Sequence, residues 1–72
     1  MIKNEEQRQR IGNDIATLRT QKGMTQQDIA DRTGQQRNHI SRIEAGKHSV
    51  GFDTLQAIAE ALDADIRIVP RT

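Results

Sequence analysis

Apolar residues recur at helical spacing along most of the chain, and glycines separate the apolar segments. In the first segment, Ile11, Ile15 and Leu18 stand at positions i, i+4 and i+7, on one face of a helix. Gly23 and Gly46 stand where glycine commonly ends a helix in the left-handed conformation. The pattern predicts four helices, over residues 4–22, 25–33, 36–45 and 52–62.

The second predicted helix begins with a capping motif. Thr25 is followed three residues later by Asp28, the spacing of a capping box, in which each side chain bonds to the backbone of the other residue. The third helix lacks this signal, because Gln35 and Gln36 stand where Ser or Thr would be preferred. We therefore expect a capped start for the second helix and a poorly capped start for the third.

The expected core is small. The second helix offers Ile29 and Ala30 to it, and the third offers Ile40 and Ile43. The expected inward residues of the fourth helix are Phe52, Leu55, Ile58, Ala59 and Leu62. Only 15 of the 72 residues are Leu, Ile, Val or Phe, and so short a chain commonly depends on a partner subunit, a metal or disulfides for stability. An oligomer is the expectation.

The C-terminal residues have a different period. Residues 65–69 alternate charged with apolar side chains and are rich in β-branched residues, which is typical of a strand, and Pro70 follows. A single strand has unpaired backbone groups, which the same strand of a second copy could satisfy across a two-fold axis. The sequence thus predicts one mainly α domain over residues 1–72, a homodimer whose short C-terminal β-strands pair antiparallel through Ile66, Arg67, Ile68 and Val69.

Composition argues against several classes of function. With no Trp, no Tyr and one Phe, the chain lacks the aromatic groups on which RNA-recognition and oligonucleotide-binding barrels stack bases. Without cysteine it can form no disulfide framework and no thiolate zinc site. His39 and His48 are joined by no carboxylate set at ligand spacing, so no metal and no cofactor is expected. No arrangement of nucleophile and base predicts an enzyme.

Location and charge add weaker expectations. The chain has neither a run of about 18 apolar residues nor a hydrophobic signal core, so we expect a cytoplasmic protein without membrane contact. The formal net charge is only +1. Residues 35–49 nevertheless carry three basic and one acidic side chain, whereas residues 50–64 carry three acidic and no basic ones. A basic segment of this kind is typical of phosphate binding, although a mixed solvated surface gives similar counts.

Across the second and third predicted helices, residues of particular sizes stand at fixed separations. Counted from Gln26, Ala30 is the fifth residue, Gly34 the ninth and Ile40 the fifteenth. Where two helices cross sharply through a short turn, the fifth residue must be small, the turn favours glycine, and the fifteenth and eighteenth residues fill the angle. Ile43 is the eighteenth. Together these positions predict a helix-turn-helix.

Over residues 11–64 the chain resembles the lambda-repressor-like, Cro/C1-type (Xre) helix-turn-helix proteins. The resemblance rests on Leu18-Arg19, Lys22–Gln26, Ile29-Ala30, Gly34, Ile40–Lys47 and Leu55–Leu62. It implies a bundle of about five helical segments that binds double-stranded DNA as a dimer, with the third helix in the major groove. The strand after Leu62 departs from simple phage repressors and resembles the tail of HipB-like antitoxins.

The resemblance also implies particular site residues. It places base contacts at Gln36, Arg37, Asn38 and Arg42 and phosphate contacts at Gln26, Ser41 and Lys47. It further implies a largely buried structural ion pair between Arg19 and Glu44. Each of the polar residues could instead be ordinary soluble surface.

Two functions from different classes follow. The first is a sequence-specific transcriptional regulator, a homodimeric repressor on an inverted-repeat operator, with the further hypothesis that it is the antitoxin partner of a protein toxin. The alternative is a protein-interaction adaptor that uses the same fold without reading DNA.

Overall fold

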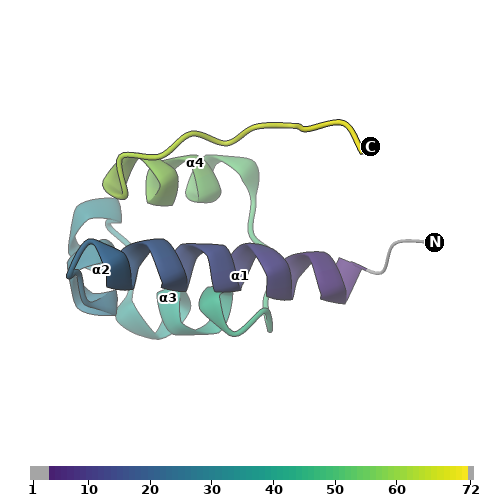
Figure 1. The fold of residues 1–72 in the computed structure, drawn as a ribbon. Coiled ribbons are helices and arrows are strands. Elements are labelled where there is room, and N and C mark those ends of the chain that lie inside the picture. Colours follow the sequence, from purple (N-terminus) through teal and green to yellow (C-terminus); the bar gives the residue numbers. More distant parts are fainter. Residues whose placement is uncertain (1–3, 72) are drawn as a thin grey trace.

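The four helices expected from the apolar pattern are confirmed in the computed structural model, which describes residues 4–71. In Figure 1, α1 runs along the front, α2 lies at its left end, α3 lies behind and below it, and α4 lies above. Among the described residues, no helix is both long enough and apolar enough to cross a membrane. The helices are α1 (Asn4–Gln21), α2 (Gln26–Thr33), α3 (Arg37–Glu44) and α4 (Phe52–Ala61).

One aliphatic core holds the four helices together. Ile29, Ile40 and Ile58, one from each of α2, α3 and α4, are completely buried. The remaining buried members of the cluster are Ile15, Ala30, Ile43 and Leu62. Because every helix or its end contributes, the small number of large apolar residues is enough to close a single core.

One expected inward residue lies at the surface instead. Phe52 is 66% exposed, so its inward placement was wrong. Ile11, which shares a helix face with Ile15 and Leu18, is 37% exposed. Phe52 is the first residue of α4, and helical side chains tilt toward the N-terminal end of their helix. Its ring therefore extends past the end of the helix, whereas Leu55, one turn later, packs against the core.

The predicted capping box at α2 is confirmed. The Asp28 backbone N–H donates to Thr25 Oγ1 over 3.0 Å, and the Thr25 backbone N–H donates to Asp28 Oδ2 over 2.8 Å. Gln36 and Gly51, at the starts of α3 and α4, make no side-chain cap. Of the two helices of the helix-turn-helix, α2 thus has a side-chain cap at its start and α3 has none.

The capping box gives stability a dependence on pH. Hydrogen bonds from the Thr25 backbone and side chain hold the pKa of Asp28 below its usual range. The folded state therefore binds fewer protons than the unfolded state just below about pH 4, and the contribution of Asp28 is lost as the pH falls through the lowered pKa. We expect Asp28→Asn to reduce the fall in urea midpoint between neutral and acid pH.

The matched control for this prediction is Thr25→Ser, which keeps both a hydroxyl and a backbone N–H at the cap. It should retain the pH dependence of the wild-type protein. If Asp28→Asn and the wild type lost the same stability on acidification, the capping box would not contribute to acid sensitivity.

The turn that follows α4 contains no glycine. Asp63 adopts a left-handed φ of 54°, which aspartate tolerates better than most residues. Its N–H donates to Glu60 O, and the N–H of Ala64 donates to Ala59 O over 2.8 Å. This turn sends the tail, residues 65–71, back over α4 toward the side of the N-terminus (Figure 1).

The tail has no regular secondary structure within the described single chain. No hydrogen bond joins the backbone of residues 65–71 to any other described residue. A strand requires a neighbouring strand, so the predicted pairing through Ile66, Arg67, Ile68 and Val69 depends on a second copy and stays a prediction.

Candidate nucleic-acid interface

Helices α2 and α3 meet in the predicted helix-turn-helix arrangement. Ala30 of α2 is 1% exposed. Ile40 and Ile43, on the inner face of α3, are 0% and 2% exposed. Gly34 ends α2 with a φ of 70°, a left-handed conformation that costs most other residues energy. The small residue, the glycine turn and the two isoleucines therefore take the places that the spacing predicted.

The opposite face of α3 is exposed and polar. Gln36 precedes the helix as its N-cap residue, and Arg37 opens the helix. Asn38 and Arg42 follow on the outer side, and all four residues predicted to contact bases are exposed. The face therefore offers guanidinium and amide groups to a partner without any rearrangement of the core.

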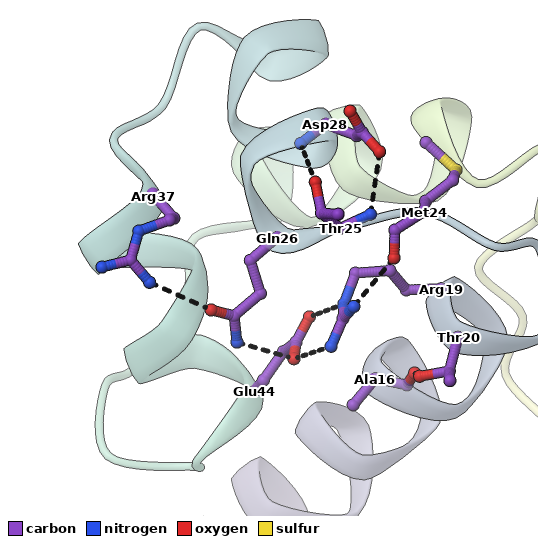
Figure 2. Close-up of polar contacts among 9 residues, drawn as sticks. All are labelled: Ala16, Arg19, Thr20, Met24, Thr25, Gln26, Asp28, Arg37 and Glu44. Carbon is purple, nitrogen blue, oxygen red and sulfur yellow. Dashed lines mark hydrogen bonds and ion pairs between the residues drawn. The ribbon is translucent and has the colours of Figure 1, made fainter.

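An ion pair fixes the end of α3 against α1. Arg19 Nε donates to Glu44 Oε2 over 2.7 Å, and a second guanidinium nitrogen donates to Glu44 Oε1 over 3.0 Å (Figure 2). The two side chains are 17% and 7% exposed. The hydrogen bond to Glu44 is the main cause that raises the pKa of Arg19 above its ordinary value, against an opposing effect of burial. This two-point contact holds α3 at one angle to α1.

The ion pair is part of a longer polar network that the sequence did not indicate. Arg19 also donates to the backbone oxygen of Met24 over 2.8 Å, just before α2 begins. Glu44 Oε1 accepts from Gln26 Nε2 over 3.1 Å, and Gln26 Oε1 accepts from Arg37 over 3.4 Å. Figure 2 shows this chain of contacts running from α1 through α2 to the first turn of α3.

Gln26 therefore has a structural role in the free protein. Both ends of its half-buried amide are engaged with protein groups. The backbone N–H groups of Gln26 and Gln27, in the first turn of α2, have no acceptor among the described residues. At this position the backbone, rather than the amide, is the group available to an anion.

The other two residues predicted to contact phosphate lie apart from this network. Ser41 is half-buried on α3. Lys47 is exposed just beyond α3, where its backbone N–H donates to Arg42 O over 3.0 Å and closes the helix end. The predicted phosphate contacts thus flank the exposed face of α3, with Gln26 at the α2 side and Lys47 at the loop.

His48, for which the sequence predicted no role, contacts a residue of this face. Arg42 and His48 Nε2 are 2.9 Å apart. A guanidinium can only donate, so the histidine nitrogen is the acceptor. The His48 ring also lies edge-to-face with His39, 6.2 Å between centroids, and His39 bonds to Gln35 over 2.8 Å. The loop after α3 thereby contacts the side chain of Arg42 through His48.

Comparisons with known proteins match most of the chain. The family model HTH_3, described as helix-turn-helix, matches residues 15–69. An uncharacterized HTH-type transcriptional regulator of Sinorhizobium fredii (strain NBRC 101917 / NGR234), y4dJ, is 34% identical over 55 residues, covering 76% of this chain and 71% of that protein. A second from the same strain, y4dL, is 33% identical over 61 residues, covering 85% of this chain but only 31% of that protein. The matched residues include the whole of α2, α3 and the turn between them.

Proposed function

Because the chain belongs to the HTH_3 family of helix-turn-helix DNA-binding regulators, we propose that it represses transcription by placing α3 in the major groove of a specific operator. The observation that carries the proposal is the exposed polar face of α3 formed by Gln36, Arg37, Asn38 and Arg42. Arginine can donate two hydrogen bonds to guanine O6 and N7, and asparagine or glutamine can pair with adenine N6 and N7.

Phosphate contacts would fix the position of α3 on the duplex. We assign them to the first turn of α2 at Gln26, to Ser41 and to Lys47, on either side of the base-reading face. Free backbone N–H groups at a helix start and a lysine ammonium are both suited to phosphate oxygens. Such contacts give affinity and register, and the face of α3 gives the sequence preference.

The proposed working form is a homodimer on an inverted repeat. Two copies of α3 reading equivalent half-sites need centres about 34 Å apart, one turn of the duplex. The apolar tail, with Ile68 and Val69 exposed, supports a second copy as the partner. The same tail, by its resemblance to HipB-like antitoxins, supports an antitoxin role in which the dimer also holds a protein toxin. We place the protein in the cytoplasm.

Selection of bound sequences from a random duplex pool, followed by gel retardation, tests this function. A regulator of this kind should enrich a two-fold symmetric sequence. With some 6 to 10 phosphate contacts, its affinity should fall by about 10³ to 10⁵ between 50 and 200 mM salt. A protein-interaction adaptor would bind no duplex even at low salt, and that result would reject the proposal.

Replacing Arg42 with alanine should weaken operator binding by about 1–3 kcal/mol and relax the preference at one base pair of each half-site. The reason is the loss of a bidentate donor from the last turn of α3. Arg10→Ala is the matched control, since it removes an exposed arginine from α1 and the same charge from the protein. Unchanged affinity and preference in Arg42→Ala, measured by retardation on the selected operator, would contradict the assignment of Arg42.

A further inference from the structure

The guanidinium of Arg42 is contacted by the protein at one edge only. Its Nη1 lies 2.9 Å from His48 Nε2, and this is the one hydrogen bond of the Arg42 side chain to any of residues 4–71. A guanidinium carries five N–H groups in a rigid plane. The contact with His48 uses one of them and leaves the edge formed by Nε and Nη2 free.

The free edge is one that arginine uses for two-point contacts in this same protein. Arg19 binds Glu44 through these two nitrogens, over 2.7 Å from Nε and 3.0 Å from Nη2. Two parallel donors of this kind also match O6 and N7 of guanine. The edge of Arg42 that is suited to a base is therefore open, while Nη1 is engaged by the protein itself.

The loop that carries His48 is anchored on both sides of it. Before it, the Lys47 N–H donates to Arg42 O over 3.0 Å. After it, Val50 packs against the core. The His48 ring also lies edge-to-face with the ring of His39 on α3, 6.2 Å between centroids. The position of His48 relative to α3 thus depends on more than its contact with Arg42.

We propose that His48 is a positioning residue for DNA reading: it accepts a hydrogen bond from Nη1 of Arg42 and so presents Nε and Nη2 to a guanine. This role rests on the proposed function, in which Arg42 reads a base. A long exposed side chain loses conformational freedom when it binds, and the loss is smaller if the side chain is already held. Only a neutral His48 can hold it, because an imidazole protonated on both nitrogens can only donate.

Protonation of His48 would therefore release Arg42. Histidine side chains change charge within the range of pH 5 to 8, and a cationic ring would then face the cationic guanidinium. The other groups near His48 that carry or can take a positive charge are His39 on α3, Arg8 on α1 and Lys47 in the loop. In the described part of the chain, no carboxylate lines the groove that His48 shares with α1 and α4, where α4 contributes the uncharged Leu55.

Base preference on the selected operator tests this role. The base pair read by Arg42 is the one whose preference Arg42→Ala relaxes, and operators altered at this base pair are compared with the selected sequence at about pH 7.5. We expect His48→Ala to reduce the preference there about 2- to 10-fold, the usual effect of freeing one long side chain. Preference at the base pair read by Arg37, which contacts Gln26 instead, should not change.

Two amide substitutions of different reach provide the matched control. The amide of glutamine can place its oxygen near the position of Nε2, whereas that of asparagine, one methylene shorter, reaches only the position of Nδ1. We expect His48→Gln to keep the preference and His48→Asn to lose it as His48→Ala does. A general effect on the loop would change both amide variants alike, and loss of the preference in His48→Gln would reject the hydrogen bond as the cause.

The pH profile of the preference provides a second readout. In the wild-type protein the preference at this base pair should fall between about pH 7.5 and 5.5, because protonation removes the acceptor. The ratio of two operators is measured, since added positive charge raises affinity for any duplex. His48→Gln should show no such fall, and His39→Gln should retain it. A fall that persists in His48→Gln, or that His39→Gln abolishes, would contradict the role of His48.

The contact itself can be measured without DNA, by nitrogen NMR of the histidine rings. A neutral His48 that accepts at Nε2 carries its proton on Nδ1, and Arg42→Ala should shift that proton toward Nε2. Operator binding without the Nδ1–H form would leave the regulator standing and reject the role of His48. The Nδ1–H form without operator binding would reject the regulator and, with it, the reading role. Unchanged base preference in His48→Ala, on an operator that the wild type binds, would overturn the role of His48 alone.

Discussion

Replacing Glu44 with alanine is expected to lower the free energy of unfolding by about 3–5 kcal/mol, the cost of breaking a buried ion pair from one side. The substitution removes both hydrogen bonds that Arg19 makes to Glu44 and the bond from Gln26. The Arg19 side chain, 17% exposed in the wild-type protein, loses its counter-charge. A 72-residue domain has roughly 4–11 kcal/mol of total stability, so the substitution would remove about a third or more of it.

Urea unfolding followed by circular dichroism measures this effect. Glu60→Ala is the matched control: Glu60 is an exposed glutamate on α4 that accepts a single hydrogen bond, from Gln56 over 3.3 Å. Surface substitutions of that kind usually change stability by less than about 0.5 kcal/mol. If Glu44→Ala kept the wild-type midpoint, the ion pair would carry no stability, and α3 would be held by its isoleucines alone.

The sequence predicted those parts of the fold that depend on local chemistry. Helical spacing located the four helices, and the capping spacing of Thr25 and Asp28 located the start of α2. The spacing of Ala30, Gly34 and Ile40 predicted the helix-turn-helix for a different reason. These residues have the sizes that two helices crossing at this angle require. Such demands appear in the sequence as restrictions on residue size at fixed separations.

Positions that depend on what another element covers were not predictable. Phe52 has the helical phase of an inward residue, yet it is 66% exposed because the packed part of α4 begins one turn later. A helical phase gives the direction of a side chain but not the extent of the neighbouring surface. The same limit applies to Ile11, at the edge of the open groove between α1 and α4.

The candidate interface also has features that the sequence predicted and features that it did not. Exposure of Asn38 and Arg42 follows from the phase of α3, which Ile40 and Ile43 fix. The contact of Arg42 with His48 depends on the path of the loop after Gly46, and no spacing rule encodes it. Engagement of Gln26 by Glu44 and Arg37 depends on how three helices cross. Sequence alone therefore indicated the face but not the contacts that orient its side chains.

At Gly12, helix propensity and the packing of α1 against α3 predict opposite effects of an alanine substitution on stability. Glycine inside a helix is less favourable than alanine by about 1 kcal/mol, so propensity alone predicts that Gly12→Ala stabilises α1. Gly12 is buried where α1 crosses the end of α3. A Cβ atom there would lie 2.5 Å from Glu44 O and 2.6 Å from Ile43 O. These are backbone atoms, which cannot rotate away as a side chain can.

We therefore expect Gly12→Ala to lower the free energy of unfolding by about 1–3 kcal/mol or more, the usual cost of overpacking. To admit the methyl group, α1 must move away from α3, and Arg19, two turns along α1, would then lose its two-point alignment with Glu44. Asn13→Ala, at the next and exposed position of α1, is the control and should be neutral or slightly stabilising, as helix propensity predicts. Urea midpoints of the two variants decide between the effects: stabilisation by Gly12→Ala equal to that of Asn13→Ala would mean that the two helices do not approach this closely in solution.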